Sequence, residues 1–390
     1  MTKAPLMTPV LIGGCCILML SFAIRASFGM FQIPIAAEFG WPRADFSMAI
    51  AIQNLAWGIG QPVFGALAER FGDRRTIILG ALLYATGLVL SAFAVTPGAH
   101  QLLNILIGFG IAGTGFGVIL AVVGRAASPE NRSVALGVAT AAGSAGQVIG
   151  APAAELLMQV YPWQTVFVIF AVVILSAMVF LPLLSAPGRA TRHELEDSLG
   201  TVLRRAFRDP SYTLIFVGFF SCGYQLGFIT AHFPAFVTEV CGAISPAGPL
   251  AALGITTTSA LGAIAISLIG LANIFGSLAS GWLGKRYTRK YLLAGIYAGR
   301  TVAATLFILL PMTPTSVILF SLVMGVLWLA TVPLTSGLVA YIYGVVWLGG
   351  RLYDITGTYD LVWWVGIGVG LFSAIVHLPI RERQMVPSAA

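Results

Sequence analysis

The chain has 390 residues, of which 58% are hydrophobic and only 9% are charged, and its formal net charge is +7 at pH 7. Soluble domains carry roughly 25% charged residues, so this composition excludes a soluble globular protein. The basic residues lie in short loops between apolar blocks, a pattern that membrane topology explains, so the positive charge does not indicate a nucleic-acid-binding surface. The four cysteines have neither the spacing of a disulfide framework nor that of metal ligands.

Apolar blocks long enough to cross a bilayer recur along the chain, since a helix needs about 20 residues to cross ~30 Å of hydrocarbon. The apolar run that starts after Lys3 continues well past Cys15, so we expect a retained first span rather than a cleaved signal peptide. The predicted spans are 8–36, 46–68, 76–96, 101–124, 133–158 and 162–184, then 212–238, 255–283, 291–311, 315–344 and 362–380. The pattern predicts an all-α membrane protein.

The polar stretch at 185–211 divides the chain into an N-terminal helical half, 1–184, and a C-terminal helical half, 212–390. We expect this stretch to be a cytoplasmic connector with an amphipathic helix lying along the membrane surface. Most of the 21 lysines and arginines fall in loops on the side of this connector. By the positive-inside rule, both termini are then cytoplasmic. The sequence thus predicts a multi-pass protein of the cell (inner) membrane, which we expect to be a monomer.

The two halves contain an internal repeat. The segment 65–75 follows the second span and the segment 281–290 follows the eighth, displaced by 216 residues. Near the start of each half, Arg25 corresponds to Gln225 at an offset of 200. Two six-helix halves in parallel pseudo-repeat are the architecture of one large class of transporters.

The loop at 65–75 resembles the signature loop of the major facilitator superfamily, and the segment 281–290 resembles a degraded copy of it. The matching residues are Gly65, Glu69, Arg70, Gly72, Asp73, Arg74 and Arg75. The resemblance implies the major facilitator fold and a conformational-switch role for this loop. Basic side chains at a cytoplasmic helix end can bond exposed carbonyls there and can pair with a carboxylate of a neighbouring span.

The stretch from Arg132 to Gly150, which covers most of the fifth span, has a spacing of alanines and glycines that resembles the monocarboxylate transporter and oxalate:formate antiporter families. This resemblance implies a secondary active transporter that moves a small organic anion by alternating access, with or without a coupled proton. Those carriers hold the carboxylate with an arginine of the eighth helix, whereas the corresponding stretch 276–281 has no cation. A drug or metabolite exporter of the same superfamily and a non-transporting membrane sensor therefore stay open as alternatives.

Arg25 is the predicted anion contact, because a cation in mid-membrane is costly and usually lines a cavity or pathway. Gln225, at the equivalent position of the second half, is predicted to face the same cavity. The other predicted substrate-binding residues are Asn54, Gln147 and Asn273, although interhelical hydrogen bonds also explain polar groups at such depth. Support of the first helix through internal carbonyls is the alternative for Arg25, and a structural role is expected for Arg300.

His232, near the outer end of the seventh span, is the candidate for proton coupling, because histidine titrates near neutral pH. A hydrogen-bonded interfacial histidine explains it equally well. No predicted span holds a mid-membrane carboxylate, and Glu155 falls near the outer end of the fifth. This argues against export of cationic drugs, against an enzyme, and against a metal or cofactor site. The expected partners are a small organic anion and the lipid bilayer.

The eleventh helix is predicted to be truncated. The repeat offset is 216 at Gly65 and Gly281 but falls to 198 at Tyr161 and Tyr359, so residues are missing after the tenth span. The remaining segment 345–357 would rise only ~20 Å as a helix, too short for ~30 Å of hydrocarbon. We therefore expect either ten full helices and a stub before the last span, or a reorganised 315–360 region.

Overall fold

The structure, a computed structural model, describes residues 6–128, 131–184, 210–246, 248–283, 287, 289–328 and 360–377. Within these ranges every regular element is a helix. The N-terminal half comprises α1 (Pro9–Ser27), η1 (Phe28–Phe31), α2 (Gln32–Phe39), α3 (Arg43–Phe71), α4 (Asp73–Ser91), α5 (Pro97–Thr114), α6 (Phe116–Ala126), α7 (Arg132–Met158), α8 (Trp163–Ser176) and η2 (Ala177–Leu183). The C-terminal half comprises α10 (Pro210–Val240), α11 (Pro249–Ala252), α12 (Thr258–Leu283), α13 (Arg289–Leu309), α14 (Pro314–Leu327) and α16 (Asp360–His377).

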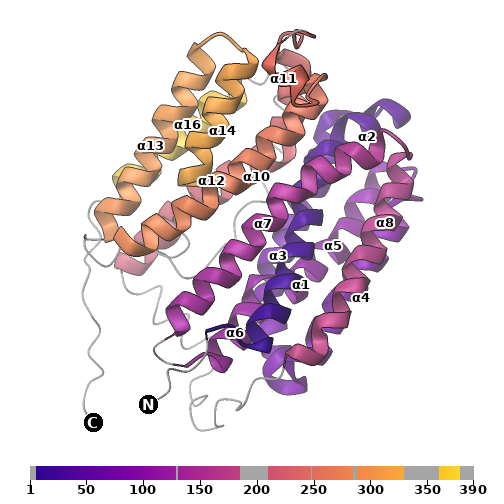
Figure 1. The fold of residues 1–390 in the computed structure, drawn as a ribbon, viewed down its shortest axis with the longest axis vertical. Coiled ribbons are helices and arrows are strands. Elements are labelled where there is room, and N and C mark those ends of the chain that lie inside the picture. The colour runs from indigo at the N-terminus through magenta and orange to yellow at the C-terminus, as the bar shows by residue number, and fades with distance from the viewer. Residues whose placement is uncertain are drawn as a thin grey trace.

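The helices gather into two groups that lie side by side, one from each half of the chain (Figure 1). All six spans predicted for the first half are present, three of them as composites. The first span is α1, η1 and α2 in succession, the fourth is α5 followed by α6, and the sixth is α8 followed by η2. In the described part of the chain, 7 helices are long and apolar enough to cross a membrane. The prediction of an all-α membrane fold in two halves is confirmed.

Large apolar side chains cover the outside of the helices. Val179 is 72% exposed, Leu102 67% and Phe275 65%. In water such exposure would be costly, but lipid tails are as apolar as these side chains. The helices are therefore built to face a bilayer outward and one another inward.

Two glycines of the N-terminal half occupy positions where a side chain would be strained or would clash. Gly72, between α3 and α4, has φ 94° and ψ 148°, a conformation that L side chains rarely adopt, and it makes the turn of the signature loop. Gly115, between α5 and α6, has an extended backbone, and a Cβ there would lie 2.4 Å from the carbonyl oxygen of Ile111. The fourth span is thus interrupted at a position where only glycine fits.

The two ends of the molecule can be told apart by their contacts. At the end that holds the Gly72 turn, the start of α1 packs on the end of η2, because a Cβ on Gly13 would lie 2.9 Å from the Cβ of Leu183. We call this the loop end. The turn at Gly40, where φ is 65°, lies between α2 and α3 at the opposite end.

The halves meet mainly through two pairs of elements. α7 packs along α12, and η1 packs against α10. The second contact is close: a Cβ on Gly29 would lie 2.1 Å from the carbonyl oxygen of Thr230. The lack of a side chain at this position therefore lets the first and seventh spans touch.

Several predictions of the second half reach beyond the described residues. α14 ends at Leu327, whereas the tenth span was expected to run to 344, and residues 329–359 are not described. The prediction of a truncated eleventh helix falls in that range and stays a prediction. Most of the expected connector at 185–211 is also undescribed, although its last two residues already belong to α10.

Candidate functional site

The signature loop ties three spans together at the loop end. Arg74 donates from Nε to the carbonyl oxygen of Leu184 at 3.1 Å and from Nη2 to that of Pro182 at 2.8 Å. Asp73 accepts from Nη2 of Arg125, at the end of α6, with the shorter distance 2.6 Å. The carbonyl contacts follow the expected chemistry. The carboxylate, however, belongs to the loop itself and the cation to the neighbouring span, the reverse of the expected pairing.

The other charged residues of the loop are exposed at the surface. Glu69, Arg70 and Arg75 are exposed, and a Cβ on Gly65 would meet nothing within 4 Å. The guanidinium of Arg70 lies 5.3 Å from the ring centroid of Phe71. The switch role of the loop stays a prediction, with Asp73 and Arg74 making its described interhelical contacts.

Arg25 is buried in the first span, with 9% of its surface exposed. Its Nη2 donates to Oδ1 of Asn54 at 3.2 Å, and Nδ2 of Asn54 donates in turn to the carbonyl oxygen of Ile50 at 2.8 Å. Nε of Arg25 is buried and has no acceptor among the described residues. The structure thus brings two predicted site residues together and leaves part of the guanidinium without a partner.

Trp57 is a member of this cluster that the sequence reasoning missed. Its ring centroid lies 4.5 Å from the guanidinium carbon of Arg25, within the range of a cation–π interaction. Its indole nitrogen, Nε1, is buried and also has no acceptor in the described part of the chain. The spacing in the sequence could have identified it, because Trp57 lies one helical turn beyond Asn54 on α3 and so on the same face of the helix.

Gln225, the positional equivalent of Arg25, is engaged elsewhere. Its Oε1 accepts from Nη1 of Arg300 at 3.2 Å, so its carbonyl faces α13. Arg300 is fully buried, donates to the carbonyl oxygen of Leu327 from Nε at 3.0 Å and from Nη2 at 2.6 Å, and also bonds that of Trp328. Arg300 therefore caps the last carbonyls of α14, consistent with the structural role expected for it.

The predicted residues Gln147 and Asn273 lie on the face where α7 meets α12. Nδ2 of Asn273 donates to Oγ of Ser144 at 2.8 Å, and the side chain of Gln147 is buried. Farther toward the opposite end, Oγ of Ser267 donates to the carbonyl oxygen of Val148 at 2.6 Å. Small polar side chains thus join the halves along this antiparallel pair, as is common between membrane helices.

His232 is fully buried and also bridges the halves. Its Nδ1 lies 3.2 Å from Nε2 of Gln32, at the start of α2, and its Nε2 lies 3.3 Å from Oγ of Ser47 on α3. Nearer the end of α10, Arg43 and Glu239 form an ion pair between the halves. Gln32 and His232 are 200 residues apart, which is the repeat offset of this region, so the repeat could have identified Gln32 as the partner.

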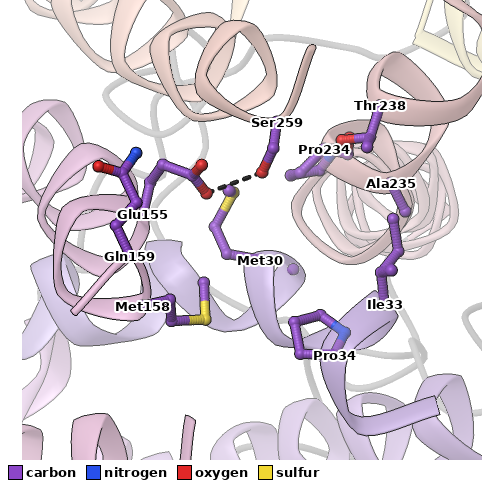
Figure 2. Close-up of a pocket in the computed structure, with 11 residues that line it drawn as sticks. Met30, Ile33, Pro34, Glu155, Met158, Gln159, Pro234, Ala235, Thr238 and Ser259 are labelled. Carbon is purple, nitrogen blue, oxygen red and sulfur yellow. Dashed lines mark hydrogen bonds between the residues drawn. The ribbon is translucent and has the colours of Figure 1, made fainter. Parts of the chain in front are cut away.

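A pocket of about 290 Å³ lies between the halves near the opposite end (Figure 2). Figure 2 shows the carboxylate of Glu155 directed across it toward Ser259, whose hydroxyl donates to Oε2 at 2.7 Å. The rest of the wall is largely apolar, with Met30, Met158 and Pro234 among its residues, and none of the residues lining it is basic. An anion is not favoured here, so the Arg25 cluster is the better candidate for an anion contact.

Two packed bundles of apolar helices, with buried polar residues between them, are the architecture of a large class of membrane transporters. The chain belongs to the Major Facilitator Superfamily, whose profile matches residues 13–370. It is a multi-pass membrane transporter and not an enzyme.

Curated relatives agree on transport and differ in cargo. The chain is 24% identical over 406 residues to the uncharacterized MFS-type transporter YcxA of Bacillus subtilis, covering 93% of this chain and 92% of that protein. Monocarboxylate transporter 13 of Bos taurus is 27% identical over 269 residues, 68% of this chain and 58% of that protein. Multidrug resistance protein MdtH of Photorhabdus laumondii is 31% identical over 222 residues, 55% of this chain and 53% of that protein.

Solved structures of transporters share the fold. The nucleoside transporter NupG superposes with a TM-score of 0.73 at 14% identity, covering 96% of this chain and 100% of that one. The xylose transporter XylE of E. coli gives 0.68 at 12% identity, covering 94% and 96%. At these identities the likeness shows the fold alone.

Proposed function

We propose that the protein is a secondary active transporter that moves a small organic anion of the monocarboxylate type by alternating access between its two halves. The observation that supports this most is Arg25, a buried guanidinium whose Nε has no acceptor in the part of the chain that the structure describes. A cation at this depth costs ~2.5–3.5 kcal/mol or more on insertion scales, so it needs a counter-charge. The monocarboxylate transporters among the relatives favour a carboxylate as that counter-charge.

The other candidate substrate-binding residues are supported to different degrees. Asn54 orients Arg25 through the 3.2 Å hydrogen bond and stays within reach of a ligand there. Gln147 and Asn273 remain proposed contacts on the face between α7 and α12. Gln225 is the weakest of the set, because Arg300 occupies its carbonyl and leaves only the amide donors for a ligand.

The contacts between the halves suggest a gate at the opposite end. His232, the Arg43–Glu239 pair and the Glu155–Ser259 hydrogen bond all join the halves there. We place both termini and the loop end in the cytoplasm of a monomeric protein of the inner membrane, so this gate faces outward. His232 stays the proposed coupling residue, because protonation would turn its acceptor nitrogen into a donor and change its bonds to the N-terminal half.

An exporter of drugs or metabolites is the second candidate, since multidrug resistance proteins are also among the relatives. The charge of the Arg25 cluster separates the two, because a guanidinium without a neighbouring carboxylate repels a cationic drug. A membrane sensor differs from both only in the absence of flux, which uptake into liposomes measures directly.

The test compares Arg25→Gln with Arg25→Lys in purified protein and in liposomes. We expect Gln to abolish uptake and to weaken carboxylate binding roughly 10- to 150-fold, the range for a lost hydrogen bond to a charged group. Lys should weaken binding less but measurably, because an ammonium cannot reproduce the planar fork of donors. Binding is read from the rise in unfolding temperature with ligand concentration.

The control is Arg70→Gln, which removes an exposed cation of the predicted switch loop. Its transport rate is expected to change, but its carboxylate affinity should fall far less than that of Arg25→Gln. An Arg25→Gln variant that binds carboxylates with the wild-type affinity would eliminate the proposal.

A further inference from the structure

The break in the fourth span exposes a helix N-terminus inside the membrane. α6 begins after Gly115, whose backbone is extended (φ −98°, ψ −164°), and no side chain caps its first turn. The first amides of a helix lack intrahelical partners, and the macrodipole makes this end partially positive. In transporters built from discontinuous helices, such ends point at anionic groups of the substrate.

This break lies close to Arg25. The hydroxyl of Thr114, the last residue of α5, lies 2.9 Å from Oγ of Ser21 on α1. Ser21 is one helical turn before Arg25, and residues four apart lie on the same face of a helix. The guanidinium and the break are therefore neighbours across the interface of α1 with the fourth span.

Trp57 connects the two. Its Nε1 would lie 3.7 Å from a Cβ placed on Gly115, while its ring lies under the guanidinium of Arg25 at 4.5 Å. Both Nε1 of Trp57 and Nε of Arg25 are buried donors without an acceptor among the described residues. Two unpartnered donors beside an uncapped helix start form an arrangement that an anion would satisfy.

Gln61 shows that an acceptor fits against this turn. A Cβ on Gly117, the second residue of α6, would lie 1.9 Å from Oε1 of Gln61, so the amide oxygen lies directly against the first turn. Gln61 is one turn beyond Trp57 on α3. An oxygen acceptor at this place is thus sterically allowed.

We propose that Arg25, Trp57 and the first turn of α6 together form a carboxylate subsite, in which Trp57 donates one hydrogen bond through its indole N–H. The inference rests on the proposed function and deepens it by naming the ligand class. The rings of Phe22 and Phe116 lie 4.3 Å apart beside the cluster, and Phe22 also packs on Trp57 at 6.2 Å. These rings favour an apolar substituent, so the ligand is a monocarboxylate with an apolar body rather than a dicarboxylate.

The experiment titrates the full-length purified protein with benzoate, and with benzamide as the uncharged comparison. Wild-type protein should bind benzoate and not benzamide. Trp57→Phe keeps an aromatic ring for Arg25 but removes the indole N–H, and should weaken benzoate binding roughly 10-fold or more. The matched control is Trp163→Phe, because the indole N–H of Trp163 donates to Glu38 at the opposite end, far from the subsite.

Gln61→Glu tests the same subsite with a neighbouring negative charge. A carboxylate fixed against the first turn of α6 places a negative charge beside the subsite, so repulsion should weaken benzoate binding more than 10-fold. The folded protein should be retained, since an anion at a helix N-terminus is stabilising. Unchanged benzoate affinity in folded Trp57→Phe and in Gln61→Glu would overturn the subsite. If Arg25→Gln still loses binding in that case, the proposed function stands without it. Wild-type protein that binds neither benzoate nor lactate would overturn both.

Discussion

Each half of the molecule holds a buried guanidinium, but on different helices and in different surroundings. In the N-terminal half it is Arg25 on the first span, with one nitrogen for which the described ranges offer no acceptor. In the C-terminal half it is Arg300 on the ninth span, where each of the three nitrogens donates to Gln225 or to the end of α14. In our proposal Arg25 is available to a ligand, whereas the described contacts of Arg300 stabilise the fold.

The repeat explains how the two arrangements are related. At the offset of 200, Arg25 corresponds to Gln225, and at the offset of 216, Arg300 corresponds to Tyr84. Tyr84 is fully buried and its hydroxyl donates to the carbonyl oxygen of Ser21 at 3.4 Å. Both halves thus keep a polar contact between their first and third spans, with the buried charge on the first span in one half and on the third span in the other. The repeat preserves where polar groups lie, and not which of them bears the charge.

The largest expected effect comes from removing the cation of Arg300. Arg300→Gln leaves the carbonyls at the end of α14 without their donor, so we expect a loss of about 3 kcal/mol or more of stability, as for other broken buried charge networks. Ligand affinity of the protein that still folds should be retained. Arg25→Gln should show the opposite, with lost affinity and a nearly unchanged unfolding temperature. Thermal unfolding and benzoate titration of both variants measure this difference. If both variants lose stability to the same extent, or both lose benzoate affinity, the proposed difference between the two arginines is wrong.

A second prediction concerns the bridge between the halves. Gln32 and His232 occupy equivalent positions, so His232→Gln makes this pair chemically symmetric and removes its only titrating member. We expect uptake in liposomes to lose or flatten its pH dependence, with the fold kept, because an amide can still donate or accept toward Ser47. The nearby charges of Arg43 and Glu239 stay in place as an internal reference. A full wild-type pH profile would show that His232 is structural.

The smallest expected effect is at the ion pair between Arg43 and Glu239. Their side chains are 16% and 28% exposed, and pairs open to solvent contribute only about 0–1 kcal/mol. Arg43→Glu should weaken the gate by repulsion and make residues near Ser259 more reactive to a water-soluble thiol reagent after substitution with cysteine. The double exchange Arg43→Glu with Glu239→Arg should restore protection at low salt. Equal reactivity in the single and double variants would remove this pair from the gate.

Much of the fold could be predicted from the sequence, because spans in lipid must be apolar over a fixed length. The composite spans could not, since η1 and the Gly115 break lie inside uninterrupted apolar runs. The end of α14 at Leu327 was also missed, because hydropathy continues past it.

The candidate site was predictable only in part. Arg25 and Asn54 were identified because polar groups are rare at depth. Trp57 gave no such signal, because an aromatic residue in an apolar span is ordinary. The orientation of Gln225 depends on Arg300, which lies 75 residues away in the chain, and no local pattern reports such a contact.

The cap on α14 has a consequence for how this protein is made. The last carbonyls of a helix have no intrahelical donor, so those of α14 need a donor as soon as they enter lipid. The donor, Arg300, lies on α13, which precedes α14 in the chain and so leaves the ribosome first. Membrane insertion of the two helices as a hairpin would shield the guanidinium and the carbonyls from lipid in a single step. We therefore expect a substitution of Arg300 to impair membrane insertion of the protein before it impairs transport.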